Sequence, residues 1–80
     1  MRATVLVRPK AGILDPQGEA VRDSLGKLEF PVTQARVGRL VDLELDATDP
    51  QEARAQVERM CAELLANPLI ESVEIQIEGA

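Results

Sequence analysis

Histidine, tryptophan and tyrosine are absent from this 80-residue chain, and cysteine and phenylalanine occur once each, as Cys61 and Phe30. Without histidine, the chain lacks the commonest metal ligand and cannot form a Ser–His or Cys–His catalytic dyad. A single cysteine cannot form an internal disulfide, and a single aromatic side chain offers almost nothing for stacking on nucleic-acid bases. These absences favour a protein that acts through its surface and has little chemistry of its own.

Long apolar runs are also missing. No run approaches the roughly 20 apolar residues that a membrane-spanning helix needs, and the apolar run near the N-terminus is too short for a signal peptide. The net charge of −5 and the pI of about 4.6 argue against binding to nucleic acid, which requires a basic patch. We therefore expect a cytoplasmic protein that binds neither membranes nor nucleic acids.

The length of the chain predicts a single domain over residues 1–80. A domain of this size buries only about 60–65% of the surface that its unfolded chain exposes, so its core is thin. Small domains often gain stability from disulfides, metals or association. Because the composition gives no disulfide and no histidine ligand, association with other chains is the expected support.

Polarity patterns predict five elements. Alternation of apolar and polar residues predicts strands over residues 2–8, 32–46 and 69–78. Helical spacing of apolar residues predicts helices over residues 16–28 and 50–66. The order β-α-β(-β)-α-β, with both helices on one face of a small sheet, predicts an α+β two-layer sandwich related to the ferredoxin-like fold.

Both predicted helices begin with the pair Asp-Pro. The side chains of Asp15 and Asp49 can accept hydrogen bonds from first-turn N–H groups, and the prolines that follow them suit the first helical position. The second helix is expected to end at Asn67, because the residue before a proline is pushed out of the helical region.

The middle strand leaves two alternatives open at Gly38-Arg39, which interrupts its pattern. This dipeptide suits a two-residue hairpin turn, but the glycine could equally mark a bend or bulge in one long strand. An unbroken strand of about 15 residues would extend roughly 50 Å. Its far half would then need a second sheet, most simply one from another subunit.

Few residues are candidates for chemistry. Cys61 lies on the apolar stripe of the second helix and is expected in the core. Lys10, near a helix start, could bind an anion, although a solvated loop charge is the more common role. No metal-ligand spacing and no phosphate-binding glycine loop is present. Gly18, in a first helical turn, costs roughly 1 kcal/mol against alanine and suggests that a backbone or partner comes close.

Three stretches, residues 12–18, 36–39 and 60–71, resemble the PurS family, the small subunits of phosphoribosylformylglycinamidine (FGAM) synthase. The resemblance covers the whole chain in length and element order. Family members often carry glycine before Phe30 and lysine after Val37-Gly38, where this chain has Glu29 and Arg39. Neither difference removes a catalytic group.

The resemblance implies a non-catalytic accessory subunit of de novo purine biosynthesis. Such a subunit bridges the ATP-dependent synthetase, PurL, and the glutaminase, PurQ, for assembly and ammonia transfer. It implies that this subunit binds no cofactor, whereas the synthetase uses ATP and Mg²⁺. It also implies self-association to a dimer or tetramer, with strands shared between protomers.

We expect a partner-binding surface on the loops that carry the resemblance, and no catalytic or metal site. Its candidate residues are Lys10, Gly12, Leu14, Asp15, Gln17, Gly18, Arg36, Gly38, Arg39, Asn67 and Pro68. The structural alternative is that these residues only build local turns. The functional alternatives are a small ligand-binding regulatory dimer of the ACT type, because βαββαβ domains often bind amino acids at a dimer interface, and a generic dimerisation domain.

Overall fold

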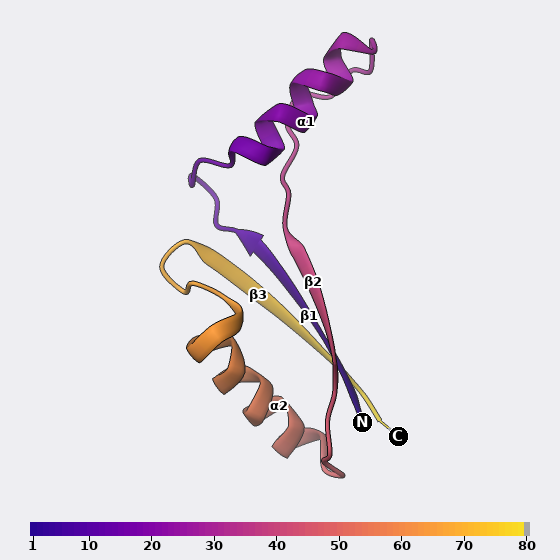
Figure 1. Ribbon diagram of the computed structural model, residues 1–80, viewed down its shortest axis with the longest axis vertical. Helices are drawn as coiled ribbons and strands as arrows, with labels where there is room; N and C mark the ends of the chain where they lie inside the picture. The colour runs from indigo at the N-terminus through magenta and orange to yellow at the C-terminus, as the bar shows by residue number, and fades with distance from the viewer. Residues whose placement is uncertain (80) are drawn as a thin grey trace.

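The computed structural model describes residues 1–79 and shows an α+β fold with a three-stranded antiparallel sheet and two helices (Figure 1). The elements follow in the order β1 (Arg2–Pro9), α1 (Pro16–Lys27), β2 (Arg39–Glu44), α2 (Pro50–Met60), a π-helical turn η1 (Cys61–Leu65) and β3 (Glu71–Glu78). The predicted fold class is confirmed. Among the described residues, no helix is long and apolar enough to cross a membrane.

The sheet is built around β1, which lies between β2 and β3 and runs antiparallel to both. Val5 at its centre pairs with Val41 of β2 and with Ile75 of β3. The alternation of β1 places Ala3, Val5 and Val7 on one face, where at most 1% of each residue's surface is exposed. The first strand therefore forms the floor of the core, as its apolar pattern predicts.

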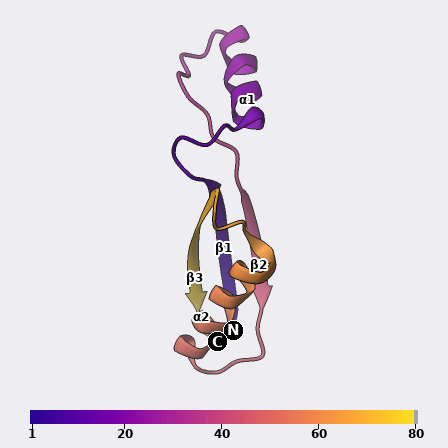
Figure 2. The ribbon, with the colours of Figure 1, turned by 90° about the vertical axis from the view of Figure 1, so that its left-hand side faces the viewer.

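Helix α2 covers this floor with Ala53 and Val57, and the turn η1 adds Cys61. Cys61 is buried as expected, and burial raises the pKa of its thiol. Asp49 caps α2, since its Oδ1 accepts a hydrogen bond from the Gln51 N–H at 3.1 Å. The opposite face of the sheet has no helix on it (Figure 2). The core is thus a single thin layer between β1, β3 and α2.

Helix α1 does not pack on the sheet, contrary to the prediction that both helices share one face. It projects beyond the end of β1 (Figures 1 and 2) and makes no extensive contact with any strand. The stretch from residue 28 to residue 38 runs back along α1 before β2 starts. Val21, Leu28 and Phe30 of this arm are 41%, 67% and 55% exposed, so its apolar side lacks a cover within the described chain.

The middle strand is shorter than the pattern predicts. Regular pairing with β1 covers only Arg39–Glu44, and residues 32–38 continue in the same direction without a strand partner among the described residues. The hairpin alternative at Gly38 is therefore wrong, because the chain does not reverse there. Strand pairing needs a neighbour, and β1 has already turned away at Pro9.

The end of α1 places Glu29 in a conformation that favours glycine. The N–H of Glu29 donates to Gly26 O at 3.0 Å and the N–H of Phe30 donates to Leu25 O at 3.0 Å, which is the bond pair of a Schellman motif. Glu29 occupies its left-handed position with φ of 70°. Glycine adopts that conformation without strain, which gives a physical reason for the glycine that the resemblance leads us to expect before Phe30.

Candidate functional site

The eleven predicted site residues gather at one end of the sheet, where β1 ends and β2 and β3 begin. Three segments meet there, residues 8–18, 34–39 and 65–71, and we call them together the junction. Figure 1 shows the three chain segments converging between α1 and the sheet. The segments lie far apart in the sequence, and hydrogen bonds from Lys10, Arg36 and Arg39 connect them.

Asp15 fixes the base of α1. Its Oδ1 accepts from the Gly18 N–H at 3.0 Å, as predicted for a cap, and its Oδ2 accepts from the Val37 N–H at 2.8 Å. The Val37 and Gly18 N–H groups, with a smaller effect from Arg36, lower the pKa of the Asp15 carboxyl. The charged form thus caps the helix and ties it to the returning chain at the same time.

Gly12 and Gly18 have reasons within the chain itself. Gly12 adopts φ of 85°, which favours glycine, and a Cβ there would meet open space. Gly18 is buried, and a Cβ there would collide with the carbonyl oxygen of Ala35. The backbone expected to come close to Gly18 therefore belongs to the same chain. A larger residue at Gly18 would displace the chain around Ala35. A loss of partner binding by such a variant could therefore not be distinguished from a change in the fold.

Gly38 allows β2 to reach the sheet. A Cβ at Gly38 would collide with the carbonyl oxygen of Val7 and lie 3.4 Å from the Arg8 Cα. All the neighbouring atoms belong to backbone, so no side chain can move aside. At Gly38, the chain that enters β2 therefore comes close to the backbone at the end of β1.

Arg39 and Glu71 connect the two edge strands at the junction. The guanidinium of Arg39 donates to Glu71 at 2.7 and 3.1 Å and to Leu65 O at 2.6 Å. Glu71 also accepts from the Asn67 N–H at 2.8 Å. The pKa of Glu71 is lowered mainly by its hydrogen bond with Arg39 and, to a smaller extent, by the bond from the Asn67 N–H. Arg39 therefore caps the last helical turn and holds the loop from residue 65 to residue 71 in place.

Lys10 and Arg36 complete the connection through neutral oxygens. Lys10 Nζ donates to Pro68 O at 2.7 Å, and its backbone N–H donates to Ile70 O at 2.8 Å. Arg36 donates to Lys10 O at 2.5 Å and to Pro9 O at 3.2 Å. The anion-binding role considered for Lys10 thus gives way, in this structure, to a bond that anchors the loop at Pro68.

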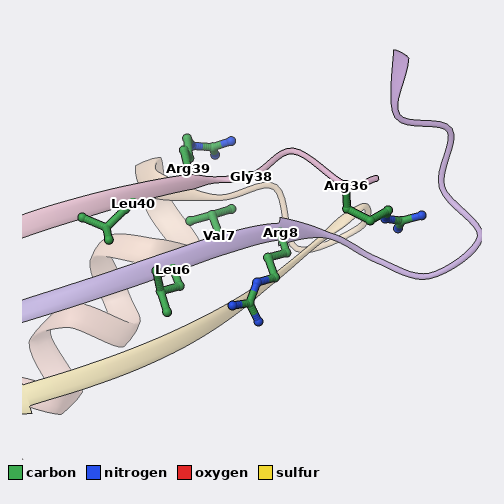
Figure 3. A pocket seen from close by; sticks show the side chains of 7 residues that line it. All are labelled: Leu6, Val7, Arg8, Arg36, Gly38, Arg39 and Leu40. Atoms are coloured by element: carbon green, nitrogen blue, oxygen red, sulfur yellow. The ribbon is translucent and has the colours of Figure 1, made fainter. Parts of the chain in front are cut away.

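The remaining candidates line or border clefts at the junction. Leu14 and Gln17 are exposed and line a cleft of about 350 Å³ with Gly38, Arg39 and Ile70. A second hollow, of about 310 Å³, lies at the end of the β1–β2 pair; its lining residues are Leu6, Val7, Arg8, Arg36, Gly38, Arg39 and Leu40 (Figure 3). Both clefts lie between chain segments that pass close to one another, and both are open to solvent.

Arg8 and Glu71 belong to this surface although neither is among the eleven candidate residues predicted from the sequence; Glu71 ends one of the stretches that carry the resemblance. Figure 3 shows Arg8 and Arg39 extending to opposite sides of the sheet. The side chain of Arg8 is exposed and makes no hydrogen bond or ion pair with residues 1–79. An isolated arginine near the end of a strand carries no motif, so only the fold indicates that it lines the same hollow as Arg36.

The junction contains no arrangement suited to bond-making chemistry. No group of three or more Asp, Glu or Cys side chains that could hold a metal ion occurs within residues 1–79. The two carboxylates at the junction, Asp15 and Glu71, are occupied by N–H groups and by Arg39. What the arrangement offers is a surface of fixed shape.

Comparison with known proteins gives matches over nearly the full chain. The model of the family described as PurS, phosphoribosylformylglycinamidine (FGAM) synthase, matches residues 2–79. The chain is similar to the Synechocystis sp. phosphoribosylformylglycinamidine synthase subunit PurS, with 41% identity over 83 residues, covering 99% of this chain and 81% of the relative.

Solved structures match equally well. Methanocaldococcus jannaschii PurS, one of the subunits of formylglycinamide ribonucleotide amidotransferase in the purine biosynthetic pathway, superposes with a TM-score of 0.88 at 32% identity, covering 99% of this chain and 96% of that one. A chain in the structure of PurLQS from Thermotoga maritima superposes with a TM-score of 0.85 at 30% identity, covering 94% and 93%.

Proposed function

The chain belongs to the PurS family of FGAM synthase subunits, and from that premise we propose that it joins a PurL-type synthetase to a PurQ-type glutaminase. In this role it is a non-catalytic accessory subunit of a glutamine-dependent, ATP-using ligase of purine biosynthesis. The T. maritima relative within PurLQS supports this assignment. The absence of histidine from the sequence is independently consistent with it.

The observation that carries the proposal is the rigid junction. Three loops that carry the family pattern are connected by Lys10, Arg36 and Arg39, although a small domain could leave such loops loose. A surface held in its bound shape loses less conformational entropy on binding. The junction is therefore the docking surface for the partner subunits, with Leu14, Gln17, Asn67 and Pro68 exposed on it.

The chemistry of the complex explains why a subunit without catalytic groups is useful. Glutaminase releases ammonia, and ammonia that escapes into water at neutral pH is mostly protonated and no longer a nucleophile. A protein-enclosed route between the active sites keeps it neutral. ATP and Mg²⁺ are bound by the synthetase, this chain binds no cofactor, and the complex works in the cytoplasm.

Self-association completes the fold. Helix α2 lies over β1 and β3, so Val41 and Leu43 of β2 stay only half-buried. Meanwhile α1 exposes apolar Val21 and Leu28 and covers no strand of its own sheet. In a dimer, or a tetramer built from dimers, the α1 arm and extended segment of one protomer cover the β2 side of the other.

Co-purification tests the proposal. A tagged form of this chain, mixed with the synthetase and glutaminase of the same organism, is expected to elute with both in one peak on size exclusion with light scattering. Substrate, ATP-Mg²⁺ and glutamine are included so that a transient complex is not missed. Failure to bind either partner, together with a thermal shift on adding one amino acid, would instead favour an ACT-type ligand-binding dimer.

A further inference from the structure

Charge is unevenly distributed along this acidic chain. The whole chain carries 9 cationic and 14 anionic side chains. The junction alone has four cations, Arg8, Lys10, Arg36 and Arg39, against two carboxylates, Asp15 and Glu71. Its balance is positive, and it stays positive when the neighbouring Glu19 of the first turn of α1 is included. One end of the sheet is thus basic, and the remainder of the chain is more acidic than the total suggests.

The internal bonds of the junction leave most of this positive charge uncompensated. Lys10 and Arg36 donate to backbone carbonyl oxygens, which are neutral, and Arg8 has no ion-pair partner within residues 1–79. Only Arg39 pairs directly with a carboxylate, Glu71. Bonds to carbonyls hold a cation in place without cancelling its charge, so the basic end keeps a fixed positive field.

The same end also presents apolar surface beside the charges. Leu40 is 57% exposed, and together with Leu6 it lines the hollow of about 310 Å³, whose charged lining residues are Arg8, Arg36 and Arg39 (Figure 3). An apolar hollow rimmed by cations is complementary to an apolar side chain flanked by carboxylates. Interfaces commonly combine such an apolar centre with a charged rim that guides association.

We propose that the junction docks on an acidic segment of a partner subunit of the synthase, whose apolar side chain enters the hollow of about 310 Å³ beside Leu6 and Leu40. This inference rests on the proposed function and specifies the chemistry of the partner. Arg8 and Arg36 supply the attraction. A nucleic acid or a second copy of this chain could also meet a basic surface, and the experiment below separates those occupants from a partner subunit.

The test measures assembly of the full chain with the synthetase and glutaminase at about 50 and about 300 mM NaCl, a range over which the Debye length falls from about 14 Å to about 6 Å. Arg8→Glu is compared with Arg59→Glu, an exposed arginine on α2 outside the junction. The two variants change the net charge equally. Arg8→Gln removes the charge without reversing it and replaces Arg8→Glu if circular dichroism shows that the latter is misfolded.

At low salt, we expect Arg8→Glu to weaken assembly about tenfold or more, Arg8→Gln by less, and Arg59→Glu by no more than about twofold. High salt should weaken wild-type assembly and reduce the difference between variants. Assembly that is indifferent to salt and to Arg8 overturns the acidic partner while leaving the proposed function intact. No assembly of wild type overturns both. Loss of self-association alone, or binding of an oligonucleotide that Arg8→Glu removes, assigns the surface to another occupant and refutes the proposal.

Discussion

Gly38→Ala is the most informative substitution in the fold, because it tests the close approach of the chain at Gly38 to the end of β1. A Cβ at Gly38 would collide with the carbonyl oxygen of Val7 and lie 3.2 Å from its carbonyl carbon. These atoms belong to a central strand that pairs on both sides. The collision can be relieved only by moving backbone, which commonly costs about 1–3 kcal/mol.

That cost converts into a measurable shift. For a domain of 60–100 residues, 1 kcal/mol lowers the unfolding midpoint by about 4–8 °C, so Gly38→Ala should lower it by roughly 5–20 °C. The assay is thermal unfolding followed by circular dichroism at one fixed protein concentration, because association raises apparent stability by mass action.

Gly26→Ala is the matched control. Gly26 lies in α1, and a Cβ there meets nothing within 4 Å, so alanine should stabilise the helix by about 0.5–1 kcal/mol. The same chemical change is thus expected to have opposite signs at two sites. A Gly38→Ala variant as stable as wild type would refute the close approach of the chain at Gly38 to the end of β1.

Three further predictions concern stability. Val57→Ala in the buried core should cost roughly 2 kcal/mol in urea unfolding, whereas Leu64→Ala, at a residue 85% exposed, should change the midpoint little; equal losses would contradict the assigned core. Glu29→Gly should stabilise the chain by about 1 kcal/mol in thermal unfolding by relieving its left-handed conformation; a loss of stability would argue against that conformation. The lowered pKa values of Asp15 and Glu71 mean that the unfolded state binds more protons at acid pH, so the free energy of unfolding should fall as pH drops below about 5, and less so in Asp15→Asn.

Local features of the fold are predictable from the sequence. The Asp-Pro pairs at Asp15 and Asp49 give both helix starts correctly, because capping depends only on residues within one turn. Alternation identifies β1 and β3 and their buried faces. Cys61 lies in the core, as its place on an apolar stripe indicates.

The position of α1 could not be predicted in the same way. An apolar stripe shows that a helix face avoids water, but not which chain covers it. The collisions that explain Gly18 and Gly38 involve Ala35 and Val7, far away in the sequence. A pattern can therefore mark these glycines as unusual, whereas only the fold identifies the backbone that approaches them.

The residues of the candidate site could be predicted from the sequence, but their bonds to one another could not. The family resemblance identifies three stretches of sequence, and the fold brings them together at one end of the sheet. The bonds of Arg39 with Glu71 and of Lys10 with Pro68 link residues that no local spacing connects. Arg8 belongs to no sequence motif, so its place in the candidate site is apparent only from the residues that lie near it in the fold.

In the proposed function, this chain joins the glutaminase to the synthetase, so that ammonia from glutamine reaches the synthetase. FGAM formation by the synthetase and glutaminase is measured with and without this chain, using either glutamine or ammonium chloride as the nitrogen source. We expect the glutamine-dependent rate to require the chain and the ammonium-dependent rate to change little without it. Equal glutamine-dependent rates in the presence and absence of the chain would refute the proposed function.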